Sequence, residues 1–98
     1  MKDVTLPLTL THPQRGAMKL EAGMIITYKI IDSSFSITSA EGVPLLWNES
    51  DNNMILPGVQ FRDAWQLLKF GQFIASIVGL RASFVNKPSS DFWVIQLN

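Results

Sequence analysis

Most of the chain alternates apolar and polar residues with a period of two, and this alternation restricts the fold more than any other feature. In the first such segment Val4, Leu6, Leu8 and Leu10 share one side and are separated by threonine or proline. Because successive side chains of a strand point to opposite faces, the pattern predicts strands with one buried face. Pro7 lacks an N–H, which favours an edge position for the first strand. The alternating segments are residues 4–10, 18–31, 34–38, 43–47, 80–84 and 92–97.

Short polar segments between these strands predict turns. Residues 11–16 (THPQRG) are expected to form a loop, and Gly23 predicts either a bulge in one long strand or a tight turn between two short ones. Residues 39–42 (SAEG) end in glycine as a type I turn often does, which predicts a hairpin of 34–38 with 43–47. Residues 86–90 (NKPSS) are expected to join 80–84 and 92–97 in a C-terminal hairpin.

One segment has the period of a helix. Phe61, Ala64, Trp65 and Leu68 recur at i, i+3, i+4 and i+7, with polar residues on the opposite face. The spacing predicts one α-helix at about residues 59–70, ended by Gly71. Residues 72–78 are rich in β-branched side chains, which favours a strand there, with continuation of the helix as the alternative.

These elements predict a single compact α+β domain over residues 1–98. We expect a strongly curved antiparallel sheet or a small barrel of about five to six strands, with one helix before a C-terminal hairpin. The order of elements is also that of an OB-type barrel.

The charges of the chain balance, with eight Lys and Arg against eight Asp and Glu. This balance disfavours a strongly basic nucleic-acid binder and a strongly acidic DNA mimic. By segment, residues 1–31 and 64–98 each carry +2, whereas residues 32–63 carry −4. The sequence therefore predicts a polarised surface that is able to steer a partner.

The chain lacks the residue patterns of common catalytic and metal sites. It has no cysteine, no HExxH motif and no phosphate-binding glycine loop, and its single histidine, His12, is expected on a solvated loop. The acidic stretch at residues 49–53 (ESDNN) lacks the ligand spacing of an EF-hand loop, so we interpret it as a turn. We expect a protein that is not an enzyme and that uses no cofactor or metal.

Aromatic residues are the most suggestive feature, because nine phenylalanines and tryptophans exceed what a minimal core requires. The leading hypothesis is a small non-enzymatic protein that binds a protein partner as an inhibitor or accessory factor and forms a homo-oligomer. The residues proposed to contact the partner are Trp47, Arg81, Phe84, Phe92 and Trp93. The alternative is that these aromatics fill the core or form a contact between copies of the chain.

The sequence is also compatible with two other functions. An OB-like module for single-stranded nucleic acid would use Lys19, Lys29 and Arg81 together with exposed aromatics. An oligomer that sequesters a small ligand such as a nucleotide is the third hypothesis.

Residues 61–75 (FRDAWQLLKFGQFIA) resemble a helix–glycine–strand element of several small phage families. These families include anti-defence proteins that sequester nucleotide signals. The resemblance covers fifteen residues and carries no site residue over to this chain; it implies a phage or mobile-element origin.

No segment resembles a targeting or membrane-spanning sequence. The first residues (MKDVT) contain no apolar stretch typical of a signal peptide, and the apolar run at 70–80 is shorter than the roughly 20 residues that span a bilayer. We expect a soluble cytoplasmic protein.

Overall fold

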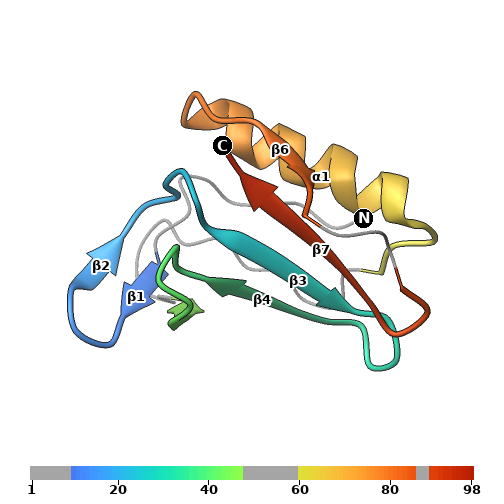
Figure 1. Cartoon of the computed structure of the whole chain (residues 1–98), viewed down its shortest axis with the longest axis horizontal. Coiled ribbons are helices and arrows are strands. Elements are labelled where there is room, and N and C mark those ends of the chain that lie inside the picture. The colour runs from blue at the N-terminus through green and yellow to red at the C-terminus, as the bar shows by residue number, and fades with distance from the viewer. Residues whose placement is uncertain (1–9, 48–59, 86–88) are drawn as a thin grey trace.

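The computed structural model describes residues 10–47, 60–85 and 89–98, which form seven strands and one helix. In chain order these are β1 (Leu10–His12), β2 (Gly16–Met18), β3 (Ile25–Lys29), β4 (Ser34–Thr38), β5 (Pro44–Trp47), α1 (Ala64–Ile77), β6 (Ala82–Phe84) and β7 (Phe92–Leu97) (Figure 1). The strands make one antiparallel sheet in the order β2-β1-β5-β4-β3-β7-β6. The α+β class and the antiparallel sheet predicted from the sequence are confirmed.

The sheet is open, so the prediction of a small closed barrel is wrong. Its two edges are β2 and β6, each of three residues, and these edges do not pair with each other. β5 changes partner along its length: Pro44 and Leu45 pair with β4, whereas Leu46 and Trp47 pair with β1. The predicted count of five to six strands is also too low, since the predicted loop at 11–16 contains the end of β1 and the start of β2. The predicted strand at 4–10 lies outside the described residues except for Leu10.

The turns that the sequence predicts agree with the structure. Gly42 donates its N–H to the Ser39 carbonyl (2.9 Å), and the β4–β5 hairpin follows from this turn. β6 and β7 form the predicted C-terminal hairpin. At Gly23 the tight-turn alternative is correct, because this residue has a positive φ of 92° and donates its N–H to the Leu97 carbonyl.

α1 begins where a short polar network satisfies its first backbone groups. Asp63 is the N-cap, and its carboxylate accepts the backbone N–H of Gln66 (3.0 Å). The amide oxygen of Gln66 in turn accepts the N–H of Arg62 (2.8 Å). These reciprocal bonds resemble a capping box and set the helix start at Ala64, later than the predicted residue 59.

The helix continues through Gly71 to Ile77, so the predicted stop at residue 70 and the favoured strand at 72–78 are both wrong. Gly71 is buried, and a Cβ placed on it would collide with Cδ1 of Ile95 in β7. Because glycine has no Cβ, the helix can pack closely against the sheet at this position. The packing offsets the low helix propensity of glycine.

The actual stop is Gly79, which has a φ of 77°. Leu80 donates its N–H to the Ala75 carbonyl (2.9 Å), and Gly79 donates to Ser76 (3.1 Å). These two bonds form a Schellman motif, in which a residue with positive φ closes the last turn.

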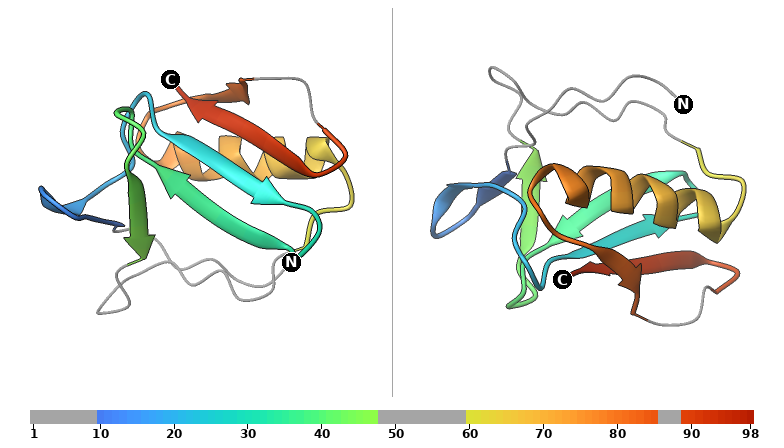
Figure 2. Two further views of the ribbon diagram at one scale, coloured as in Figure 1. Left: turned by 60° about the horizontal axis from the view of Figure 1, so that its bottom comes forward. Right: turned by 90° about the horizontal axis from the view of Figure 1, so that it is seen from above.

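α1 packs on one face of the sheet, against β6 and β7 (Figure 2), and the core lies between these layers. Tyr28 of β3 is central to the core: its ring stacks on Trp93 (centroids 5.7 Å apart) and meets Phe61 edge-on (5.0 Å). Its hydroxyl accepts the backbone N–H of Phe61 (3.3 Å), which fixes the segment leading into α1. In the described ranges, no helix is long and apolar enough to cross a membrane.

Candidate functional site

The outward side of α1 exposes large hydrophobic side chains. Trp65 is 66% exposed, Phe73 56% and Ile77 46%. Trp65 lies on the flank near the edge strand, where its ring meets Phe84 of β6 edge-on (6.1 Å). A helix of a small domain normally turns such side chains inward, so this outward aromatic surface is a candidate interaction site.

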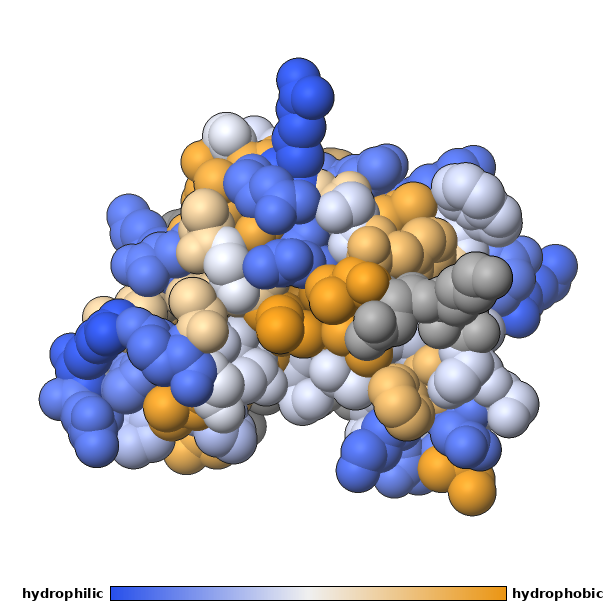
Figure 3. Space-filling model, viewed as in Figure 1, coloured by the Kyte–Doolittle hydropathy of each residue, from blue (hydrophilic) through white to orange (hydrophobic). Residues whose placement is uncertain are grey.

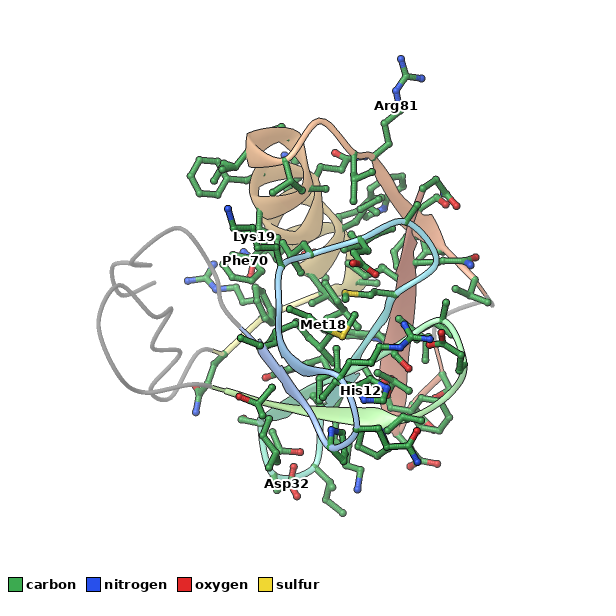
Figure 4. The ribbon with its side chains drawn as sticks, turned by 90° about the vertical axis from the view of Figure 1, so that its left-hand side faces the viewer. His12, Met18, Lys19, Asp32, Phe70 and Arg81 are labelled. Atoms are coloured by element: carbon green, nitrogen blue, oxygen red, sulfur yellow. The ribbon has the colours of Figure 1, made fainter. Side chains whose placement is uncertain are left out.

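Phe73 also lines a cleft of about 630 Å³ beside the first half of α1. Two buried rings, Phe61 and Phe70, line it as well, with centroids 5.5 Å apart. This volume is within the range of small-molecule and side-chain pockets. Phe70, a residue of α1, is labelled in Figure 4.

Polar and cationic groups complete the described lining of the cleft. Arg62 and Lys69 supply two positive charges, and Gln60 and Gln66 supply amides. Within the described residues neither cation forms an ion pair, and no carboxylate lines this cleft. The cleft therefore combines an apolar interior with a positively charged rim.

One wall of the cleft is held by backbone hydrogen bonds. Phe61 is fixed by its N–H bond to the Tyr28 hydroxyl, and Arg62 by its N–H bond to the Gln66 amide. Because both bonds lie within the chain, they restrict the wall that Phe61 and Arg62 form, and less conformational freedom of this wall is lost on binding.

The structure divides the aromatic residues that the sequence proposed as partner contacts. Trp93 is buried, 8% exposed, and packs on Tyr28, so we now assign it to the core and no longer expect it to touch a partner. Phe92 is 45% exposed on the face of the sheet away from α1, whereas Phe84 is half-buried under Trp65. The side chain of Trp47 lies outside the described part of the structure.

The three cations proposed for nucleic-acid binding lie apart. Lys29 ends β3 opposite Phe92, whereas Arg81 pairs with Asn98 beyond the other end of β7. Six residues of strand separate these positions, which is about 20 Å. Arg81 projects from one end of the molecule and Asp32, beside β3, lies at the opposite end (Figure 4). Lys19 lies in the connection from β2 to β3. The structure therefore gives no continuous cationic track through these three residues.

The face of the sheet away from α1 is a second exposed surface. Figure 3 shows apolar atoms gathered across its middle, over β3 and β7. Thr27 pairs with Val94 there, and Ile25 pairs with Gln96. Most of these side chains are only half exposed, whereas the cleft described above lies beside α1. This surface is therefore a weaker candidate than the α1 cleft.

The titratable groups with shifted pKa values stabilise turns outside the cleft. Hydrogen bonds from the Ser34 hydroxyl and N–H lower the pKa of Asp32. The N–H of Glu41 itself, the Ser39 hydroxyl and then Arg15 lower the pKa of Glu41. Both carboxylates are exposed, and the Arg15–Glu41 ion pair joins the β1–β2 turn to the β4–β5 turn.

His12 is buried, 3% exposed, so its prediction as a solvated loop residue is wrong. It is the last residue of β1, and its Nδ1 accepts the backbone N–H groups of Gln14 (3.0 Å) and Arg15 (3.2 Å). The side chain closes the turn between β1 and β2, which is a structural role. In the described part of the chain, no three His, Asp or Glu residues are grouped as metal ligands, and the acidic stretch at 49–53 lies outside that part.

The sequence pattern did not identify the two main residues of this site, Trp65 and Phe73. It placed Trp65 on the buried helix face and Phe73 in a strand, but the buried stripe consists of Leu67, Leu68, Phe70, Gly71, Ile74 and Ala75. The available signal was the apolar spacing from Leu67 through Phe70 to Ile74, which continues a helical period across Gly71. That spacing would have left Phe73 on the outer side.

Comparison with protein families finds no matching family model, and comparisons with curated proteins and with solved structures find no significant match. The helix that runs through residues 64–77 also replaces the helix–glycine–strand element on which the phage resemblance rested.

Proposed function

We propose that this protein is a non-enzymatic interaction module that binds a protein partner through the outer face of α1 and acts as an inhibitor or accessory factor. The observation that supports this proposal most directly is the exposure of Trp65 and Phe73 on α1, together with the cleft that Phe73 lines. Aromatic residues at the edge of a pocket are the side chains that most often dominate binding energy in protein interfaces.

The proposed nucleic-acid function has weaker support. Its three cations lie on separate parts of the fold, so they do not form the groove that tracks a phosphate backbone. The α1 surface instead has a mainly aromatic centre with a charged rim, which is the usual organisation of a protein interface.

The test is affinity capture from native lysate with three forms of the protein. Phe73→Ser removes the exposed ring from the cleft, and Ile31→Ser changes a side chain that is 87% exposed in the β3–β4 connection, away from α1. We expect the same partner with wild type and Ile31→Ser, and a loss of at least about tenfold in affinity with Phe73→Ser.

Two outcomes would overturn the proposal. One is a partner that all three forms retain equally, because the α1 surface would then be irrelevant. The other is recovery of the bait alone. In that case, sedimentation of wild type and Phe73→Ser measures the oligomeric state of each form. This measurement shows whether the α1 surface binds a second copy of the chain instead.

A further inference from the structure

We infer that the α1 cleft recognises an acidic segment of the partner that inserts one large apolar side chain. This inference rests on the proposed function and specifies the chemistry of the partner. It follows from three properties of the cleft: its aromatic interior, its two cations, which form no ion pair within the described residues, and the hydrogen bonds that hold one of its walls.

The aromatic interior selects the inserted side chain. Phe61 and Phe70 are buried within the fold, and Phe73 is half exposed above them. An apolar side chain placed among these rings removes apolar surface of both molecules from water, whereas a polar side chain would lose its hydrogen bonds to water there.

The cations of the cleft determine which residues of the partner are favoured next to the inserted apolar side chain. Arg62 and Lys69 are exposed, and within the described residues they have no carboxylate partner. Both line the cleft, Arg62 just before the first turn of α1 and Lys69 in its second turn. The Asp63 carboxylate caps α1 and offsets the partial positive charge of the helix N-terminus, so Arg62 and Lys69 are the positive groups of the described lining. Asp or Glu next to the apolar side chain therefore complements the rim.

Because the wall of the cleft is held in place, we expect a short segment of the partner to be sufficient for binding. The hydrogen bonds from the Phe61 N–H to the Tyr28 hydroxyl and from the Arg62 N–H to the Gln66 amide hold the segment that leads into α1, which forms one wall of the cleft. Most of the conformational entropy lost on binding is then that of the peptide, and little is that of the protein.

The first experiment selects binders from a random-peptide display library on the wild-type protein. We expect the selected peptides to contain a large apolar residue with Asp or Glu beside it. A synthetic fluorescein-labelled copy of the strongest peptide is then titrated with wild type, Arg62→Glu/Lys69→Glu and the matched control Lys29→Glu, which changes an exposed lysine at the end of β3.

We expect the double charge reversal to weaken binding by at least about tenfold and to make binding less sensitive to salt, with Lys29→Glu unchanged. Thermal unfolding of each variant shows whether the fold is retained. Selected peptides that are basic or uncharged, selection of no peptide, or equal binding by the double variant would each overturn the inference. Binding of a labelled oligonucleotide that competes with the peptide would overturn it in favour of a nucleic-acid ligand.

The same double variant separates this inference from the proposed function. In affinity capture, a partner that is lost with Phe73→Ser but retained with Arg62→Glu/Lys69→Glu leaves the protein-binding function standing and removes the acidic-segment chemistry. A partner that is retained by both removes the function itself.

Discussion

Gly71→Ala is the substitution that most directly tests how α1 meets the sheet. Alanine is the better helix former, and on an exposed helix the change would stabilise by about 1 kcal/mol. Here the new Cβ would collide with Cδ1 of Ile95 and reach 3.5 Å from Cβ of Ala82. Because Ile95 is fully buried, the collision has to be relieved by moving core atoms, which costs about 1–3 kcal/mol. We therefore expect a net destabilisation of about 0–2 kcal/mol.

Shortening Ile95 isolates this collision. Ile95→Val removes Cδ1 and alone costs about 0.5–1.5 kcal/mol. The remaining neighbour, Cγ1 of Ile95, lies 3.6 Å from the new Cβ, which is an ordinary contact. In the double variant the alanine methyl fills space that Cδ1 leaves, and the helix-propensity gain is recovered. We expect a favourable coupling of about 1–3 kcal/mol, measured by urea unfolding of wild type, both single variants and the double variant.

Gly79→Ala is the matched control. Gly79 has a positive φ and nothing within 4 Å of a Cβ, so alanine there costs only backbone strain, about 1–2 kcal/mol. This cost should be the same with isoleucine or valine at position 95. Additivity of Gly71→Ala and Ile95→Val within about 0.5 kcal/mol would refute the close-approach explanation of Gly71.

Three further predictions concern the core, the β1–β2 turn and acid stability. Trp93→Ala should destabilise by about 3–5 kcal/mol because its ring is buried on Tyr28, whereas Phe92→Ala, at 45% exposure, should have a much smaller effect in thermal unfolding; similar losses would contradict the assigned burial. His12→Ala should cost about 1–3 kcal/mol by removing the acceptor for two backbone N–H groups, and His12→Asn, whose oxygen occupies the place of Nδ1, should recover most of it in urea unfolding; equal losses would argue against the acceptor role. The lowered pKa values of Asp32 and Glu41 give stability that is present at neutral pH and is lost as the pH falls through the folded-state pKa values. The stability gap between wild type and Asp32→Asn/Glu41→Gln should therefore close in acid, and a gap that does not change with pH would contradict these assignments.

The candidate site was less predictable from the sequence than the fold. Arg81, Phe84 and Phe92 were proposed as neighbours in one contact surface, but Phe92 lies on the opposite face of the sheet from Phe84. The alternation shows that Phe92 and Trp93 point to opposite sides, and it contains no information on which side α1 covers. That choice makes Trp93 a core residue and leaves Phe92 exposed.

The sequence by itself determined the local features: the period-two strands, the turn at 39–42 and the C-terminal hairpin of β6 with β7, and therefore the α+β class. These features depend on neighbouring residues, through side-chain alternation and the backbone preferences of glycine and proline. Tertiary structure alone decided that the sheet stays open, that α1 passes through Gly71, and that Phe73 faces outward. Each of these depends on contacts between residues far apart in the chain, such as the pairing of β1 with β5 and the packing of Gly71 on Ile95. For Gly71, the apolar surface that close packing buries stabilises the helix by more than the low helix propensity of one glycine destabilises it.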